Sequence, residues 1–363
     1  MQPRSIAALS LAAALALAGC ATGPATAPAP SVTNDPSVPL AELEVLADPR
    51  SYIGESTALL RDAAIPAPAQ APAQRLPSTV VSHDLGGDTE VAVASTERIL
   101  PMDLSGSIAA TVFGLGFGDF VVGRDTSTTF PGTEALPLVT TGGHTVNSEA
   151  ILALRPTLVI TDGTIGPVDV VLQLRDAGIP VVFVDTDPSI AGVGELAVQV
   201  ATALGAPAAG EALAAELMAG IEAKIAEIAG ILPATEPLRM LFLYLRGTSG
   251  VYYLFGAESG ADVLIEALGG VDVAAELGLD GMRPMTDEAM IAADPDLILV
   301  MTGGLASVGG VDGLLESKPA IALTAAGQHR RFVSMADGQV LGFGPRTAEV
   351  LDALARAIYA PGR

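Results

Sequence analysis

The stretch from Ser189 to Leu232, SIAGVGELAVQVATALGAPAAGEALAAELMAGIEAKIAEIAGIL, is rich in alanine, glutamate and leucine and has no run of β-branched residues. Because Gly205-Ala206-Pro207 interrupts it, the stretch predicts one helix of about four turns and a second from Pro207 to Ile231, which Pro233 ends. A helix of about 25 residues is about 37 Å long, enough to cross between two lobes. The apolar residues of the second helix recur at helical spacing: Leu213, Leu217, Ile221, Ile225 and Ile228.

On both sides of this stretch, short β-branched runs alternate with helical patterns, which is typical of βαβ units. About 285 residues follow Ser78, and a single hydrophobic core usually serves fewer residues than this. The sequence therefore predicts an α/β protein of two lobes with mostly parallel sheets, joined by the long rigid helix. The expected strands are Val91–Ala94, Val121–Gly123, Leu158–Thr161, Val181–Val184, Met240–Leu245, Leu297–Met301 and Phe332–Ser334, and the expected helices include Ile108–Gly114, Ser148–Leu154 and Val168–Ala177.

A weak internal repeat supports two similar lobes. The segment from Asn147 to Ile160 matches the segment from Thr286 to Leu299, with a glutamate seven residues before a proline in each. Each segment reads as a short helix followed by a strand. Any capped helix that leads into a strand resembles this pattern, which is the alternative explanation.

The N-terminus has the layout of a secretory signal, with Arg4 followed by an apolar stretch from Ile6 to Ala18. Leu17-Ala18-Gly19-Cys20 resembles the lipobox of bacterial lipoproteins, in which Cys20 is acylated and becomes the mature N-terminus. The stretch is too short for a membrane-spanning helix, which needs about 20 apolar residues. The expected organisation is a signal peptide at 1–19, the lipidated cysteine and an Ala/Pro-rich tether with short helices at 20–78, an N-terminal α/β lobe at 79–187, an interlobe helix region at 188–234 and a C-terminal α/β lobe at 235–363.

Composition excludes several classes of function. The formal net charge of −23 argues against nucleic acid and against electrostatic attraction to anionic lipid headgroups. Cys20 is the only cysteine, so a metal in the mature domain must be held by nitrogen and oxygen ligands. The sequence has no Gly-x-Ser-x-Gly, His-Glu-x-x-His or Walker motif, and Gly114-Leu115-Gly116-Phe117-Gly118 reads as a helix end and a turn. We therefore expect a protein that is not an enzyme.

Several motifs between Glu97 and Pro361 carry a resemblance to a known family. They are Gly123-Arg124-Asp125-Thr126-Ser127, Gly143-His144, Glu149-Ala150-Ile151-Leu152-Ala153-Leu154-Arg155-Pro156, Gly178-Ile179-Pro180-Val181-Val182 and Tyr244-Leu245-Arg246-Gly247. In these the chain resembles the haem-binding lipoproteins of bacterial ABC importers, within the larger group that carries vitamin B12 and siderophores.

The resemblance implies a monomer, anchored by lipid on the extracytoplasmic face of the cell membrane, that holds haem b between two lobes. It also implies an ABC permease with its ATPase subunit as partners. Basic residues of that permease are expected to bind Glu149 and Glu288, which lie one on the surface of each lobe. The alternative interpretation is that both are carboxylates in the first turn of a helix, which stabilise the helix through its dipole.

The side chains of Tyr244, Arg246 and His144 suit a ferric ion that is bound from two sides. Ferric iron favours a phenolate oxygen, and some haem proteins use an axial tyrosine. Residues two apart on a strand point to the same face, so the guanidinium of Arg246 can lie beside the Tyr244 oxygen and stabilise the anion. His144 would supply a neutral imidazole nitrogen from the opposite lobe.

Other residues compete for these roles or complete the site. Tyr252 and Tyr253 are the substitutes for Tyr244, whereas His83 and His329 are assigned to structure or solvent. The expected apolar walls are Phe255, Met282 and Met285, and the candidates for binding the propionates are Arg124, Arg283 and Arg346.

Three other functions remain open from the sequence. A siderophore or cobalamin carrier on the same scaffold would need no axial protein ligand. A carrier of bare zinc or manganese is a further reading, although no ligand cluster of suitable spacing is visible. From another class, the chain could be an anchored hydrolase of unseen mechanism or an adhesion module.

Overall fold

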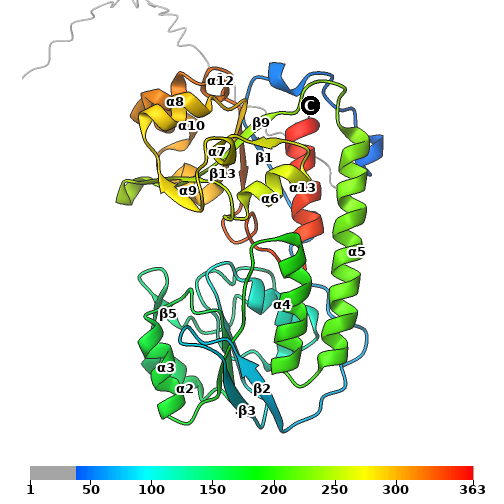
Figure 1. Ribbon diagram of the computed structural model, residues 1–363, viewed down its shortest axis with the longest axis vertical. Coiled ribbons are helices and arrows are strands. Elements are labelled where there is room, and N and C mark those ends of the chain that lie inside the picture. The colour runs from blue at the N-terminus through cyan, green and yellow to red at the C-terminus, as the bar shows by residue number, and fades with distance from the viewer. Residues whose placement is uncertain (1–37, 363) are drawn as a thin grey trace, which may run out of the picture. The chain divides into compact units, whose positions relative to one another are not determined.

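The computed structural model describes residues 38–362 (Figure 1). These residues belong to one compact unit. The expected signal peptide, Cys20 and the first part of the expected tether, residues 20–37, lie outside the described residues. Within 38–362, none of the helices combines the length and the apolar character that crossing a membrane requires.

The C-terminal lobe is built on a seven-stranded sheet in the order β1-β14-β13-β9-β10-β12, with β11 beside β9. The first four strands are parallel, and β10 and β12 are antiparallel additions. The strands are β1 (Ser56–Thr57), β9 (Arg239–Arg246), β10 (Val251–Phe255), β11 (Val271–Asp272), β12 (Met282–Pro284), β13 (Leu297–Met301) and β14 (Phe332–Met335).

The N-terminal lobe has a parallel three-stranded sheet, β4-β7-β8, with buried side chains on both faces. Such continuous burial explains why these strands read as unbroken apolar runs in the sequence. The elements of this lobe are β2 (Ser78–Ser82), β3 (Thr89–Val93), β4 (Ile99–Met102), α1 (Ser107–Gly114), β5 (Thr140–Thr141), β6 (Thr145–Val146), α2 (Ser148–Leu154), β7 (Leu158–Thr161), α3 (Val168–Asp176) and β8 (Val181–Phe183).

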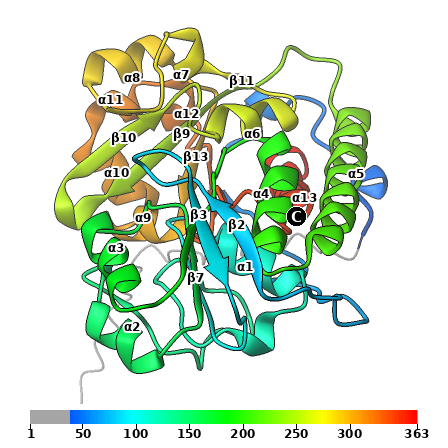
Figure 2. The ribbon, with the colours of Figure 1, turned by 60° about the horizontal axis from the view of Figure 1, so that its bottom comes forward.

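Two long helices connect the lobes, α4 (Ile190–Ala203) and α5 (Pro207–Ile231), and they lie side by side in both views (Figure 1, Figure 2). Near the start of α5, Leu213 packs against the core of the N-terminal lobe, whereas Ile221 and Ile228 are buried in the core of the C-terminal lobe. One helix therefore contributes to both cores, as its apolar spacing predicted. The bounds of α5 are those that Pro207 and the prolines after it indicated.

The remaining helices surround the C-terminal sheet. The α13 helix packs beside α5, and its apolar face is buried in the same core. These helices are α6 (Ala261–Ala267), α7 (Val273–Glu276), α8 (Asp287–Ala293), α9 (Thr302–Ala306), α10 (Gly310–Ser317), α11 (Pro319–Ala322), α12 (Ala325–Gln328) and α13 (Thr347–Tyr359).

Two expectations about local structure differ from the fold. The segment Val121–Gly123 does not form a strand but a single parallel bridge, Val121 to Ile99. The chain turns away directly afterwards, because the carboxylate of Asp125 accepts hydrogen bonds from the backbone of Ser127 and Thr128 and closes a tight loop.

The folded structure also begins earlier than Ser78. In the segment 38–77, Leu40 and Ala58 are buried in the C-terminal core, and β1 pairs with β14 at the edge of the sheet. The chain then reaches the N-terminal lobe, where the backbone of Arg75 donates a hydrogen bond to Gly205. The short helices expected here are present as 3-10 turns, Leu40–Glu42 and Pro49–Ser51. The low sequence complexity of the segment had also indicated a tether, but its few apolar residues pack against partners that are far away in the sequence.

The internal repeat has a structural counterpart in α2 and α8. Each helix is capped by a side chain that accepts a backbone hydrogen bond, Asn147 for α2 and Thr286 for α8. Each ends at a residue with positive φ, Arg155 at 46° and Asp294 at 37°. A buried proline and a parallel strand follow in both lobes, so the two lobes share this unit.

Candidate functional site

Tyr244 and Arg246 lie on one face of β9 at its carboxyl end. The preceding residue on that face, Phe242, is buried in the core between the sheet and α5, and Tyr244 packs against that core. Leu243 and Leu245 are buried on the opposite face. Tyr244 and Arg246 are both half-buried, so β9 brings a phenol and a guanidinium together at the carboxyl edge of the sheet, where ligands bind in open α/β folds.

Asp337 holds the guanidinium of Arg246 over the face of the tyrosine ring. The guanidinium carbon is 4.7 Å from the centroid of the Tyr244 ring. Its Nη1 donates to the carbonyl of Leu245 at 3.0 Å and its Nη2 donates to Oδ2 of Asp337 at 2.8 Å. The sequence predicted Arg246 on the same face but beside the phenol oxygen; the two acceptors explain why the guanidinium lies over the ring.

The structure distinguishes Tyr253 from Tyr252. On β10, Tyr253 is directly opposite Tyr244 and packs against the same core. Tyr252 lies on the other face, where its ring receives the ammonium of Lys318 at 4.0 Å. Of the two substitutes for Tyr244, only Tyr253 shares its face of the sheet.

Among the expected wall residues, Phe255 lies against Tyr244 but is only 6% exposed, so it belongs to the core behind Tyr244 and does not form a wall of the site. The two rings are stacked with centroids 5.9 Å apart. Met282 pairs with Phe255 across β10 and β12 and is 58% exposed, so it extends the same face outward. Met285 packs into the core on the opposite face and does not join this group.

His144 is carried by the N-terminal lobe, in the hairpin between β5 and β6. Gly142 and Gly143 have φ of 56° and 97°, the left-handed region that glycine adopts without a steric cost. The carbonyl of Gly143 accepts a hydrogen bond from Thr126 at 2.7 Å, which ties the turn to the loop after Gly123. The imidazole is exposed, and Figure 1 shows β5 on the part of its lobe nearer the other lobe.

The three arginines proposed for propionates are in different surroundings. Arg283 pairs with Leu254, whose side chain is in the core opposite Tyr244. Arg124 donates to the carbonyls of Asp125 and Thr128. Arg346 is buried, which lowers its pKa, and its guanidinium lies 5.4 Å from the centroid of the Phe130 ring, across the junction of the lobes. None of these contacts joins the three arginines to Tyr244.

The other two histidines have local partners. His83 Nδ1 is 3.0 Å from a carboxylate oxygen of Asp88, and His329 follows the last residue of α12, where its carbonyl accepts from Gly54. Among residues 38–362, no three histidine, cysteine, aspartate or glutamate side chains gather closely enough to hold a metal ion.

Two acidic side chains of the N-terminal lobe, Asp103 and Asp125, are fully buried near the carboxyl end of β4. Asp103 accepts hydrogen bonds from the backbone of Ser107 and Ile108 at the start of α1. The backbone of Asp103 donates to the carboxylate of Asp125 at 2.9 Å. Burial, with the neighbouring charge of Asp125, raises the pKa of Asp103 to about 8. The pair therefore fixes two loops at this edge of the lobe.

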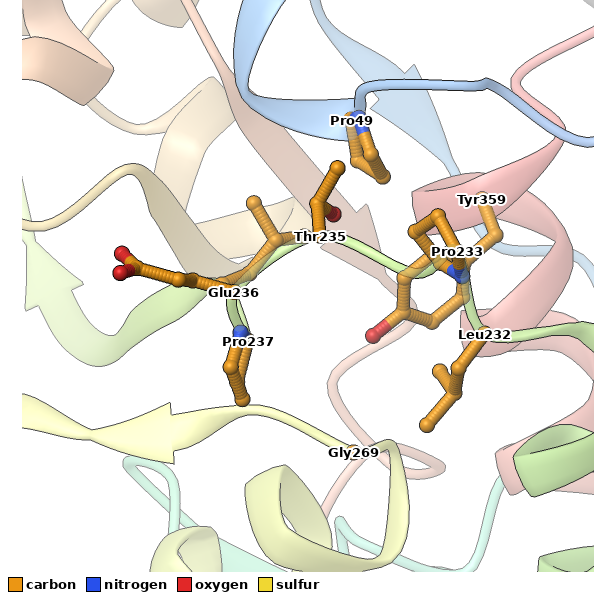
Figure 3. Close-up of a pocket in the computed structure, with 9 residues that line it drawn as sticks. Pro49, Leu232, Pro233, Thr235, Glu236, Pro237, Gly269 and Tyr359 are labelled. Atoms are coloured by element: carbon orange, nitrogen blue, oxygen red, sulfur yellow. The ribbon is translucent and has the colours of Figure 1, made fainter.

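Two hollows in the described part of the chain lie elsewhere. One, of about 50 Å³, lies between Leu232, Pro233 and Tyr359 (Figure 3), and it is far too small for a ligand the size of a cofactor. The other, of about 420 Å³, is open and lies between the β2–β3 turn and α3, beside Leu85 and Phe183. Neither is lined by Tyr244 or His144, so the candidate site is defined by the side chains at the strand ends.

Glu149 and Glu288 occupy equivalent places, the second helical residue of α2 and of α8, and both are exposed. Asp337 is the residue of the site that sequence analysis missed. The available signal was its position two residues after β14, at the carboxyl end of a parallel strand.

The sequence pattern of a family described as periplasmic binding protein matches residues 103–337. Among solved structures, the chain is similar to that of the haem-binding protein HmuT, with 42% identity and a TM-score of 0.80 over 86% of this chain and 99% of that one. Structures of HmuT with a histidine, a tyrosine or an arginine replaced by alanine match at 41 to 42% identity.

Two relatives have different descriptions. A cobalamin-binding protein of Halobacterium salinarum is 28% identical over 297 residues, which cover 80% of this chain and 78% of that protein. An uncharacterized ABC transporter substrate-binding lipoprotein of Bacillus subtilis, YvrC, is 27% identical over 283 residues, which cover 77% of this chain and 85% of that protein.

Proposed function

The chain belongs to the periplasmic binding protein family, and on that premise we propose that it captures haem outside the cytoplasm and delivers it to an ABC importer. The family binds and carries its ligands and does not convert them. The cell would acquire iron from the imported haem. The permease and its ATPase subunit would be the partners of this chain.

The observation that carries the proposal is the pair of Tyr244 and Arg246 on one face at the carboxyl end of β9. In HmuT, the tyrosine and the arginine that were replaced by alanine are also two positions apart. The histidine that was replaced there precedes the tyrosine by about a hundred positions, as His144 precedes Tyr244 here. This spacing supports the assignment of the same three residue types to the site of this chain.

We assign the axial ligands of a ferric haem b to Tyr244 and His144. The phenol of Tyr244 would bind as the anion, which the positive charge of Arg246 and the iron both stabilise. His144 would approach from the other lobe as a neutral imidazole, and its exposed position in a glycine turn leaves its ring nitrogens accessible. Tyr253 would offer an apolar surface to the macrocycle beside Tyr244, and the buried ring of Phe255 supports Tyr244 from the core.

A haemin titration tests this proposal on protein that lacks residues 1–20, which precede all of the described residues, 38–362. We expect a saturable shift of the Soret absorption in the wild type, and altered spectra for both His144→Ala and Tyr244→Ala. Tyr252→Phe is the matched control, since that tyrosine also stacks with a cation but on the other face of the sheet. Its spectrum should equal that of the wild type.

The other outcomes are distinct. Binding with neither spectrum altered would keep haem as the ligand and move the ligation to Tyr253. An absence of binding to the wild type would exclude haem as the ligand. The similarity to the Halobacterium salinarum protein makes cobalamin the second candidate, and a cyanocobalamin titration by calorimetry would test it. In that case His144→Ala and Tyr244→Ala should bind like the wild type, because cobalamin needs no axial ligand from the protein.

We also propose that residues 1–19 are removed and that Cys20 carries the lipid that holds the protein at the outer face of the cell membrane. The similarity to the lipoprotein of Bacillus subtilis supports this anchor. Cys20→Ala should move the protein from the membrane fraction to the soluble extracytoplasmic fraction without changing haemin binding. Retention of this variant in the membrane fraction would contradict the anchor. We expect the protein to be a monomer when it carries haem, and sedimentation would test this oligomeric state.

A further inference from the structure

The carboxylate of Asp337 joins two elements at the edge of the candidate site. Its Oδ1 accepts a hydrogen bond from the backbone N–H of Gly303 at 2.7 Å, and its Oδ2 accepts from Nη2 of Arg246 at 2.8 Å. Gly303 is at the start of α9, directly after β13. The side chain that holds Arg246 is therefore itself fixed by the backbone.

Strand order explains why Asp337 reaches Arg246. The strands β9, β13 and β14 are parallel neighbours, so their carboxyl ends meet at one edge. Arg246 ends β9, Gly303 follows β13, and Asp337 follows β14. Three segments that are far apart in the sequence thus converge on one guanidinium.

The start of α9 leaves room for this arrangement. A Cβ built on Gly303 would be 2.9 Å from Oδ2 of Asp337. A Cβ on Gly304 would be 2.7 Å from the carbonyl oxygen of Leu245 and 3.0 Å from Nη1 of Arg246. Any larger residue at either position would crowd the carboxylate or the guanidinium. Both glycines therefore belong to the same arrangement as Asp337.

The ion pair is too accessible to be explained by stability alone. The side chain of Arg246 is 32% exposed and that of Asp337 is 35% exposed, and pairs of this kind contribute little to folding because water screens them. A fixed guanidinium is, however, valuable beside a phenol that must bind a metal as its anion, because the cation is then in place before the ligand arrives.

We propose that Asp337 is a positioning residue of the ligand site, which acts through Arg246 by holding the guanidinium over the ring of Tyr244. This inference rests on the proposed function. Asp337 itself makes no bond to haem. Without its carboxylate, the arginine side chain would leave the ring for solvent, and Tyr244 would lose the cation that lies over its ring.

A double-mutant cycle tests whether Asp337 acts through Arg246. We expect Asp337→Ala to weaken haemin binding about tenfold and to alter the absorption spectrum of the tyrosinate-bound haem. In the Arg246→Ala background, Asp337→Ala should change affinity by less than about twofold. Asp337→Asn should restore part of the affinity, because its side-chain oxygen can still accept from Gly303.

Two further variants separate position from charge. Gly303→Ala keeps both charges but displaces the carboxylate, and it should reproduce part of the effect of Asp337→Ala. Asp312→Ala is the control, since it removes a carboxylate from another arginine of the same lobe, Arg330, with which Asp312 pairs at 2.7 Å. Its haemin affinity and absorption spectrum should be those of the wild type.

A measurement on the haem-free protein distinguishes this inference from the proposed function. The Nε–Hε resonance of Arg246 should carry a ring-current shift from Tyr244, and Asp337→Ala should abolish that shift. An unchanged shift in the variant, or effects on affinity that multiply in the double variant, would overturn the positioning role. Lack of haemin binding by the wild type would overturn the proposed function and the role of Asp337 in haem binding, even if the shift is lost as expected.

Discussion

Tyr253 lies directly opposite Tyr244 in the antiparallel pair of β9 and β10. Side chains at opposite positions of an antiparallel pair project from the same face, with Cβ atoms about 4.5 to 5.5 Å apart. The rings of Tyr244 and Tyr253 both pack against the core beside α5. Phe255, two residues after Tyr253 on β10, stacks on the ring of Tyr244. The two half-buried phenols thus present an aromatic surface beside Arg246, and the buried ring of Phe255 supports Tyr244 from the core.

This surface leads to a prediction about the two neighbouring tyrosines of β10. Tyr253→Ala should weaken haemin binding about three- to tenfold, because it removes apolar contact area, but should leave the tyrosinate spectrum in place. Tyr252→Ala should change the affinity less than about twofold, since that side chain is on the other face. Titrations of both variants check this. Equal losses of affinity in the two variants would contradict the assignment of the face.

The second prediction concerns Glu149 and Glu288. Replacing either by arginine should reduce uptake of haem by cells at least about tenfold, because a like charge would oppose the basic residues expected on the permease. Haemin affinity of the purified variants should equal that of the wild type, and the unfolding free energy should fall by only about 0.5 kcal/mol.

The matched control for this docking prediction is Glu97→Arg, an exposed glutamate of the N-terminal lobe outside the repeated helices. Uptake assays in cells that carry each variant, with protein levels checked, measure the effect. Normal uptake by Glu149→Arg and Glu288→Arg would leave only the helix-dipole role for these residues.

The third prediction is a pH dependence of stability that depends on Asp103. Burial raises the pKa of Asp103 to about 8 in the folded protein and also raises the pKa of its hydrogen-bonded neighbour Asp125, both above the value near 4 of an unfolded chain. The folded state therefore binds the extra proton between these values, so the free energy of unfolding should fall as pH rises from about 4 to 8. Asp103→Asn should flatten this slope.

Denaturant unfolding at several pH values measures this slope. The exposed carboxylate of Asp88 is the control, and Asp88→Asn should retain the slope of the wild type. An Asp103→Asn variant with an unchanged slope would show that the proton is bound elsewhere.

The fourth prediction concerns the link between α5 and α13. The ammonium of Lys224 is 2.8 Å from Asp352, which also accepts from Arg356. Burial alone would raise the pKa of Asp352, but the hydrogen bonds from Arg356 and Lys224 outweigh it and lower the pKa. The stabilisation is therefore present above the unfolded pKa near 4 and is lost as pH falls through the lower folded value.

Asp352→Asn should lower the free energy of unfolding by about 2 kcal/mol at pH 7, because two cations lose a partly buried partner. Glu276→Gln, which breaks the exposed pair with Arg239, should cost less than about 0.5 kcal/mol. Thermal or denaturant unfolding compares the two. A loss for Asp352→Asn no larger than for Glu276→Gln would contradict the prediction.

Local sequence determined most of the secondary structure. Pro207 and the apolar spacing after it gave α5 its bounds, and continuous apolar runs marked β7 and β13 at their observed residues. These features depend on neighbours within one turn or one strand, which is the range over which sequence patterns act. The segment 38–77 was misread for the opposite reason, since Leu40 and β1 are stabilised only by contacts with the distant C-terminal core.

The sequence by itself also determined the chemistry of the candidate site, because Tyr244 and Arg246 are two positions apart on one strand and share a face whatever the fold. Only the tertiary structure decided what surrounds them. It placed Tyr253 opposite Tyr244 through the β9–β10 register and Asp337 beside Arg246 through the order of β9, β13 and β14. Register and strand order are set by packing between distant segments, and no pattern within a short window of sequence carries that information.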